Sequence, residues 1–254
     1  MKKYPFISFA FIAMLNLVFI SCEKESPCEL SGDCNEVQLI NPANAENPFD
    51  EIGVQHNKGL ASLRKNYQTD IDAISATSSI ESEYYVFGRS AEFANSNPDL
   101  HHLLRERLRL TTADQLLGNY NFADYDKWLS VLNMDDASHE VLRNSIAAVM
   151  QIEPGSVEAT NDIIRAIKEQ ERLILAQPDL PARDFALVLM AVWRHSNHYW
   201  MDISNGEPSP NRATWWQIGL ADAVCGGIGF ALGGPAGGIG LGVGASKVVA
   251  GFRD

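Results

Sequence analysis

The chain has 254 residues, of which 46% are hydrophobic and 20% are charged, and its formal net charge is −12 at pH 7. A chain of this length can bury one sizeable core. The acidic balance opposes binding to phosphate backbones, and there is no basic patch that would hold anionic lipid. We therefore expect no nucleic-acid partner.

The N-terminus has the composition of a secretory signal. Two lysines follow Met1, and an apolar run extends from Phe6 to Ile20, interrupted only by Ser8 and Asn16. This apolar core is shorter than the roughly 20 residues that a membrane-spanning helix needs. We therefore predict a lipoprotein-type signal peptide over residues 1–21.

The end of this segment, Ser21 followed by Cys22, resembles the lipobox of bacterial lipoproteins, with Phe19 standing where leucine is usual. The resemblance implies that Cys22 is diacylated, becomes the first residue of the mature chain and anchors it to a membrane. Stable anchoring needs more than one acyl chain, which this processing supplies. The implied location is the bacterial cell envelope, with the outer membrane preferred and the exposed face left open. The alternative is an ordinary signal peptide in which Cys22 has no role.

Residues 22–46 are rich in acids and poor in large apolar residues, so we predict a flexible tether. The acids just after Cys22 also resemble the export tags of surface lipoproteins of the Bacteroidota. Cys28 and Cys34 lie six residues apart in an exported chain, a spacing that permits a small disulfide loop. Cys225 is expected to pack as a small buried hydrophobic residue.

Residues 47–205 show the periodicity of amphipathic helices. At Asn47-Pro-Phe-Asp50, an Asn cap, a proline and an acidic first turn favour a helix start. Ile52, His56 and Leu60 follow at helical spacing, and we expect His56 to be a core histidine. No stretch alternates like a strand, so we predict an all-α fold, a multi-helix bundle. Further helices are expected at about residues 70–87, 98–108, 112–117, 122–132, 141–152, 157–176 and 182–201, the last apolar nearly all round and therefore central.

The segment from Asn47 to Asn57, Asn-Pro-Phe-Asp-Glu-Ile-Gly-Val-Gln-His-Asn, resembles a stretch at the domain start of uncharacterised Bacteroidota lipoproteins that also have a glycine-rich C-terminus. That family has no assigned activity. The resemblance implies a class of protein and a cellular location, and it implies no mechanism.

The end of the most apolar helix holds the candidate for a metal site. His195 and His198 are three residues apart and share a helical face, and Asp202 follows one turn later. Because Trp193 and Trp200 are interleaved, the alternative is aromatic and imidazole packing at a helix end. We find no zinc-type cysteine pairs, serine-hydrolase arrangement or phosphate-binding loop, so we expect no cofactor and no enzymatic activity.

Residues 211–254 contain a stretch in which ten of the nineteen residues from Gly226 to Gly244 are glycine. Gly233-Gly234-Pro235 predicts a helix end, a turn and a new helix start. We therefore predict a C-terminal antiparallel helical hairpin. Its small residues allow two backbones to approach closely, as in a glycine zipper.

A turn centred between Gly234 and Pro235 determines which residues face each other across the hairpin. Asp222 then meets Lys247 at the open end, and these are the only charged residues from Ile218 to Lys247. Glycines pair along the arms, Gly229 with Gly240 and Gly227 with Gly242. The glycines expected to pack are Gly227, Gly229, Gly233, Gly237, Gly240 and Gly242.

Each arm of this hairpin is about 22–24 Å long at about 1.5 Å per residue, and the hydrocarbon core of a bilayer is about 30 Å thick. Glycine disfavours helices, so the hairpin needs a partner surface: the helical body, a membrane or another copy of the chain. Three functions remain open: a non-catalytic lipoprotein that uses the hairpin for packing or assembly, a membrane-active or pore-forming protein that inserts it, and a metal-dependent hydrolase that uses His195 and His198.

Overall fold

A computed structural model describes residues 37–107, 129, 134–153, 155–204 and 215–251. These residues form seven helices and no strand, which confirms the predicted all-α class. Residues 38–254 belong to one compact unit. The helices are α2 (Asp50–Ser75), α3 (Ser79–Ala94), α4 (Leu100–Arg107), α7 (Asp136–Met150), α8 (Val157–Leu175), α9 (Arg183–Ile203) and α10 (Trp215–Gly251).

Several predictions concern residues outside the described part of the chain. These are the signal peptide, the lipidation of Cys22, the Cys28–Cys34 disulfide, and the expected helices at 112–117 and, apart from residue 129, at 122–132. They remain predictions.

Polar caps fix where several helices begin. The side chains of Ser78, Asp135 and Ser156 each accept a hydrogen bond from a backbone N–H of the first helical turn. The cap at Ser78 places a turn where the periodicity predicted continuous helix, so α2 runs on to Ser75 and α3 begins at Ser79. Asn47 does not cap α2, because the helix begins three residues later and the side-chain oxygen of Asn47 accepts the N–H of Phe49, which precedes the first helical turn.

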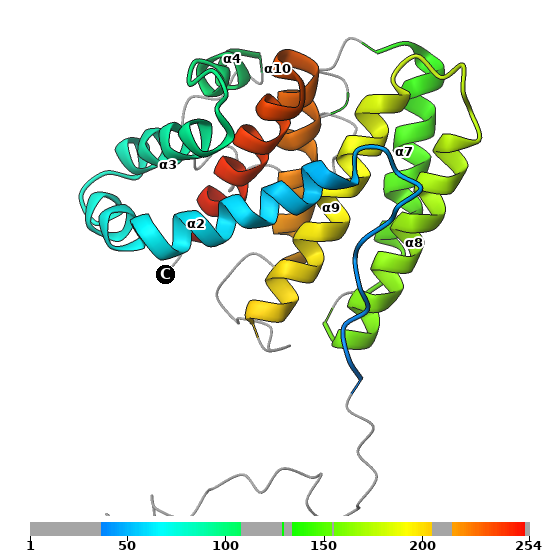
Figure 1. Ribbon diagram of the computed structural model, residues 1–254, viewed down its shortest axis with the longest axis horizontal. Coiled ribbons are helices and arrows are strands. Elements are labelled where there is room, and N and C mark those ends of the chain that lie inside the picture. Colours follow the sequence, from blue (N-terminus) through cyan, green and yellow to red (C-terminus); the bar gives the residue numbers. More distant parts are fainter. Residues whose placement is uncertain (1–36, 108–128, 130–133, 154, 205–214, 252–254) are drawn as a thin grey trace, which may run out of the picture. The chain divides into compact units, whose positions relative to one another are not determined.

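The most apolar helix, α9, lies at the centre of the unit, as its sequence predicted. Every residue from Phe185 to Asn197 is buried. α9 packs against α2, α8 and α10, and Figure 1 shows it in yellow between α8 and the two arms of α10. An all-round apolar helix is stable only with neighbours on every side, and these helices provide them.

The last helix, α10, is interrupted at Gly233 and Gly234, whose backbone angles are not helical. Gly234 has a φ of 63°, a left-handed conformation that glycine adopts without strain. The break separates a first arm, residues 215–232, from a second arm, residues 235–251, and the two arms lie side by side (Figure 1). A Cβ atom on Gly229 would overlap the carbonyl oxygen of Gly237, so the two backbones are in contact there.

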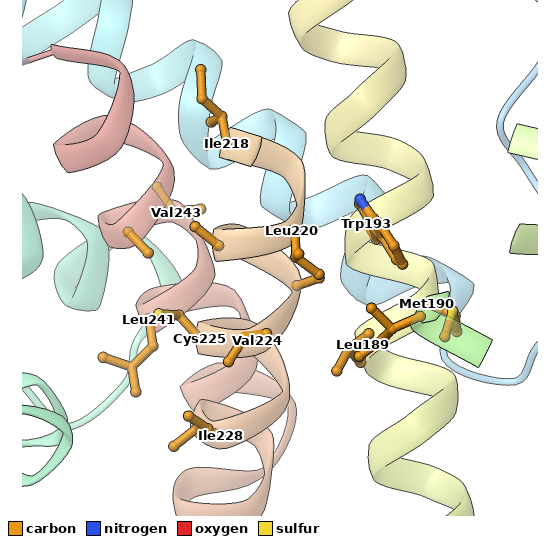
Figure 2. Close-up of a cluster of buried hydrophobic side chains, with 14 of the residues drawn as sticks. Leu189, Met190, Trp193, Ile218, Leu220, Val224, Cys225, Ile228, Leu241 and Val243 are labelled. Carbon is orange, nitrogen blue, oxygen red and sulfur yellow. The ribbon is translucent and has the colours of Figure 1, made fainter. Parts of the chain in front are cut away.

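Both arms of α10 lie in the interior of the unit. All residues are buried from Ile218 to Gly229 in the first arm, and from Gly240 to Ser246 in the second. The first arm packs on α9, where Val192 lies against Gly226. Figure 2 shows buried apolar side chains of α9 and of the two arms that belong to one core cluster: Leu189, Met190, Trp193, Ile218, Leu220, Val224, Cys225, Ile228, Leu241 and Val243. One segment of the described residues, Ile218–Lys247, is long and apolar enough to cross a membrane by length and composition alone.

Candidate functional site

The extended segment Gln38–Asn47, here called the N-terminal strap, runs alongside α8 (Figure 1). Asn161 of α8 accepts the backbone N–H of Ile40 at 2.9 Å and donates to the carbonyl oxygen of Gln38 at 2.9 Å. Side chains of α8 thus satisfy backbone groups that a free tether would leave to water. Residues 38–46 of the strap were predicted to be the end of a flexible tether. This part of the prediction is wrong, because these residues are hydrogen-bonded to α8.

A buried ion-pair cluster joins α2, α8 and α9. Arg194 is fully buried, and its Nη2 donates to Glu171 Oε1 at 2.8 Å and to Asp50 Oδ1 at 2.7 Å. His195 Nε2 lies 2.9 Å from the same Asp50 oxygen, and the side-chain amide of Asn47 donates to Glu171 Oε1 at 2.7 Å. The negative charges of Asp50 and Glu171 thus balance the positive charge of Arg194, and the hydrogen bonds between them fix the positions of the three side chains.

The charges of this cluster suit it to holding helices together and make it unsuited to proton transfer. Partial burial opposes ionisation of Asp50, but the hydrogen bonds from His195 and Arg194 and the charge of Arg194 outweigh it and lower its pKa to about 2. A carboxylate with so low a pKa is a poor general base at neutral pH. Glu171 is completely buried and also accepts from Asn44 at 2.6 Å.

The candidate metal site does not form. No group of three His, Cys, Asp or Glu side chains in the described part of the chain is placed to hold a metal ion. His195 faces Asp50, whereas His198 is half-buried, and this burial lowers its pKa despite the charge of Asp202. His195 is instead engaged in the ion-pair cluster, so the three residues do not converge on one point.

A second buried group, here called the Asp222 cluster, joins α10 to α2 and α9. The carboxyl group of Asp222 accepts hydrogen bonds from the hydroxyls of Ser196 and, at 2.6 Å, Ser246. Trp200 Nε1 donates to Ser246 Oγ at 3.0 Å, and His56 Nε2 lies 3.7 Å from Asp222 Oδ2. Although it contains serine, histidine and aspartate, this cluster has no exposed side chain through which a substrate could be reached.

Burial keeps the central pair of this cluster uncharged at neutral pH. It raises the pKa of Asp222 to about 8, against the hydrogen bonds from Ser196 and Ser246 that favour the carboxylate. Burial also lowers the pKa of His56 to about 4. Cys225, one turn from Asp222, is buried as predicted, and burial raises the pKa of its thiol. The described geometry is that of a neutral acid beside a neutral imidazole.

The predicted Asp222–Lys247 closure is wrong. Asp222 is bonded to Ser246, the residue before Lys247, and Lys247 Nζ donates to Gln68 Oε1 of α2 at 2.5 Å. A charged lysine is stabilised by turning toward the surface of α2, whereas a fully buried acid can stay neutral between two hydroxyl donors. The polar residues at the open end therefore join the two arms through Ser246 and Asp222, and they join α10 to the body through Ser196 and Gln68.

The glycines of α10 make close contacts, but their partners differ from the ones expected. Gly229 faces Gly237, one helical turn away from the predicted Gly240. The others lie against body side chains: a Cβ atom would meet Phe185 at Gly227, Leu100 at Gly233, Ser96 at Gly240 and His56 at Gly242. The zipper therefore seats the arms against α2, α3, α4 and α9 as much as against each other.

A shallow surface depression of about 340 Å³ lies over α8 and the strap. Its charged groups are already engaged, since Arg165 pairs with Asp162 at 2.6 Å and Arg172 with Glu169 at 2.6 Å. Lys168 donates to the carbonyl oxygen of Asn41 at 2.9 Å. The lining residues are Asn44, Glu46, Arg165, Lys168, Glu169 and Arg172, and their mixed charges select no ligand class.

Comparison with protein-family models, curated proteins and solved structures yields no match to this chain. The resemblance to Bacteroidota lipoproteins stays a prediction.

Neither buried polar cluster was predicted as a unit, although single residues gave a signal. Arg194 interrupts the most apolar helix, and Glu171 lies on the apolar stripe of α8 between Ile167 and Ile174. A charged residue on a buried face requires a partner. Its partner could not be identified from the sequence, because Asp50 precedes Arg194 by 144 residues.

Proposed function

We propose that this protein is a non-catalytic, lipid-anchored protein of the bacterial cell envelope, in which α10 supplies the packing core of a helical body. The observation that carries this proposal is the burial of both arms of α10 against α9, α2 and α3. A glycine-rich hairpin that is buried in its own body already has the partner surface that its weak helix propensity requires.

The absence of a catalytic role is supported by how the reactive side chains are used. His56 and Ser196 are fully buried in the Asp222 cluster, and His195 is bonded to Asp50. A nucleophile or general base must reach its substrate. The described histidines and serines of the two clusters are instead engaged in holding helices together.

The lipid anchor is proposed from Cys22 alone. The residues between Cys22 and the strap could span at most about 50–55 Å when fully extended, at about 3.3–3.6 Å per residue. The body would then stay close to the membrane, and we propose the outer membrane as its location. Its biological role would be structural or assembly-related, because the reactive side chains of the two clusters hold helices together.

The test of the anchor is Cys22→Ser, with Cys28→Ser as the matched control. We expect Cys22→Ser to abolish metabolic labelling by a palmitate analogue and to move the protein from the membrane to the soluble fraction. Cys28→Ser should remain labelled and membrane-bound. Unchanged fractionation of Cys22→Ser would refute the anchor.

A further inference from the structure

Among the described side chains, the hydrogen bonds between α10 and the body lie toward one end of the helix pair. At the open end, Asp222 accepts from Ser196, and Lys247 donates to Gln68. The opposite end, here called the tip (Phe230–Ala236), contains no polar side chain and is exposed at Ala231, Gly233 and Pro235. The contacts of the tip are apolar, such as the edge-to-face packing of Phe230 on Phe49 at 5.3 Å.

The arms have the composition of a lipid-soluble hairpin. Residues 218–247 form the segment of the described chain that is apolar and long enough for a membrane. Because the chain reverses at Gly233 and Gly234, each arm reaches about 26–27 Å at about 1.5 Å per residue, which is less than a hydrocarbon core of about 30 Å. Such a hairpin, entering with its tip first, would penetrate a bilayer without crossing it.

The open end is held by a pair of buried, incompletely bonded groups on separate helices. His56 of α2 and Asp222 of α10 are 3.7 Å apart, and in the described part of the chain neither His56 Nε2 nor Asp222 Oδ1 has a hydrogen-bond partner of good geometry. Unpaired buried polar atoms weaken the packed state. Separating α10 from α2 and α9 would expose His56 to water and remove this cost.

Several polar and ionisable groups lie on the elements packed around the pair. α9 presents His195, whose charge would oppose protonation of His56, together with Ser196 and Trp200. α10 adds Ser246 and the thiol of Cys225. On α3 and α4, Glu83 and His101 lie 2.8 Å apart, and His101 is stacked on the ring of Phe87 that Gly244 contacts.

We propose that acidification releases α10 from the helical body and that its two arms then enter a lipid bilayer, tip first. This proposal is independent of the lipid anchor at Cys22. The partner is the hydrocarbon layer of a membrane, because the released arms carry only one acidic and one basic residue, both near the open end. Lys247 can extend to the headgroups from there.

Proton linkage separates insertion from unfolding. When α10 enters lipid, His56 stays on α2 and gains a proton in water, whereas Asp222 stays in apolar surroundings and keeps its own. Insertion therefore takes up one proton between about pH 6.5 and 4, and its equilibrium constant rises up to about tenfold per pH unit. Complete unfolding in water also ionises Asp222, so the pair takes up no net proton in that window.

The test is a disulfide lock between α10 and α9. Val192 Cγ2 lies 3.2 Å from the position of a Cβ on Gly226, so Val192→Cys and Gly226→Cys place two sulfurs within bonding reach. The lock is built in the full chain, with Cys22, Cys28 and Cys34 replaced by serine and Cys225 by alanine. The oxidised and reduced forms of one protein then serve as variant and control.

Flotation with vesicles of pure phosphatidylcholine, whose zwitterionic headgroups minimise charge-driven adsorption, is measured at pH 7.5 and 4.5. We expect the reduced form to float at least tenfold more at pH 4.5 than at pH 7.5, and the oxidised form to remain with the soluble fraction at both. Equal flotation of the two forms, or no flotation of the reduced form at pH 4.5, would overturn the proposal.

Two further measurements identify the trigger. Without vesicles, the reduced form should keep its helical circular dichroism and cooperative unfolding at pH 4.5, and unfolding there would contradict the proposal. In the unlocked chain, His56→Gln should remove most of the tenfold pH dependence, and an unchanged dependence would contradict the role of His56.

Discussion

Asp222 and His56 respond to pH in opposite directions. The pKa of Asp222 is about 8 in the folded protein and 3.8 for the unburied group, so a rise in pH destabilises the folded state across this window. The pKa of His56 is about 4 when folded and 6.5 when unburied, so a rise in pH stabilises the folded state between these values. The two effects cancel between about pH 4 and 6.5.

Of these two residues, only Asp222 has a protonation state that differs between the folded and unfolded protein from about pH 6.5 to 8. We expect this residue to lower the free energy of unfolding by about 2 kcal/mol across that interval, at about 1.4 kcal/mol per pH unit. Asp222→Asn keeps a polar side chain of the same shape but cannot ionise, so most of this decline should disappear. Urea denaturation of both proteins at pH 6.5 and 8 measures the difference, and parallel declines would show that Asp222 does not cause it.

Arg194 is buried and paired with carboxylates, so its replacement should affect stability strongly. Arg194→Met would leave Glu171 buried without its cation, and we expect a loss of about 3–5 kcal/mol of stability. Glu171→Gln keeps hydrogen-bonding capacity without the charge, so the double variant should lose clearly less than the two single variants summed. A double-mutant cycle by urea denaturation tests this, and simple additivity would mean that the two residues are not coupled.

Glycine is needed for close backbone contact in α10, whereas in α3 it faces open space. A Cβ atom on Gly229 would overlap backbone of the opposite arm, which cannot give way as a side chain can. Gly229→Ala should therefore cost at least about 3 kcal/mol. Gly88 of α3 is exposed, with open space where a Cβ would lie, so Gly88→Ala should stabilise the protein by about 1 kcal/mol.

Thermal or urea denaturation of these two variants compares the same substitution in two settings. If Gly229→Ala were tolerated within about 1 kcal/mol, the arms would not be in close contact. If Gly88→Ala were also strongly destabilising, alanine would be harmful for a reason unrelated to the arms.

Periodicity predicted the helices better than it predicted their ends. The central position of α9 follows from residues 185–193, which are all apolar. The end of α2 was misplaced because the heptad-like spacing continues past Asp70, and the turn depends on one serine cap at Ser78. Such local caps compete with periodicity and can override it.

At the scale of the whole molecule, contacts between distant residues were beyond prediction. Asp222 and Lys247 were matched by counting from the turn, yet Asp222 is bonded to Ser246, one residue earlier, and to Ser196 of α9, and Lys247 is bonded to Gln68 of α2. The same applies to Asp50 and Arg194, since nothing local indicates which helix lies opposite a buried charge. The sequence thus indicated the fold class and the candidate buried residues, and only the packed structure shows how they combine.

The N-terminal strap also determines how the body would respond to a mechanical pull. Its bonds with Asn161, Lys168 and Glu171 follow one another along α8 in the direction of the chain. A force applied at residue 37 would act along these bonds in shear, so that they resist together rather than opening one after another. The helical body would therefore tolerate tension from its N-terminal side better than an equal force that peels the strap away from α8.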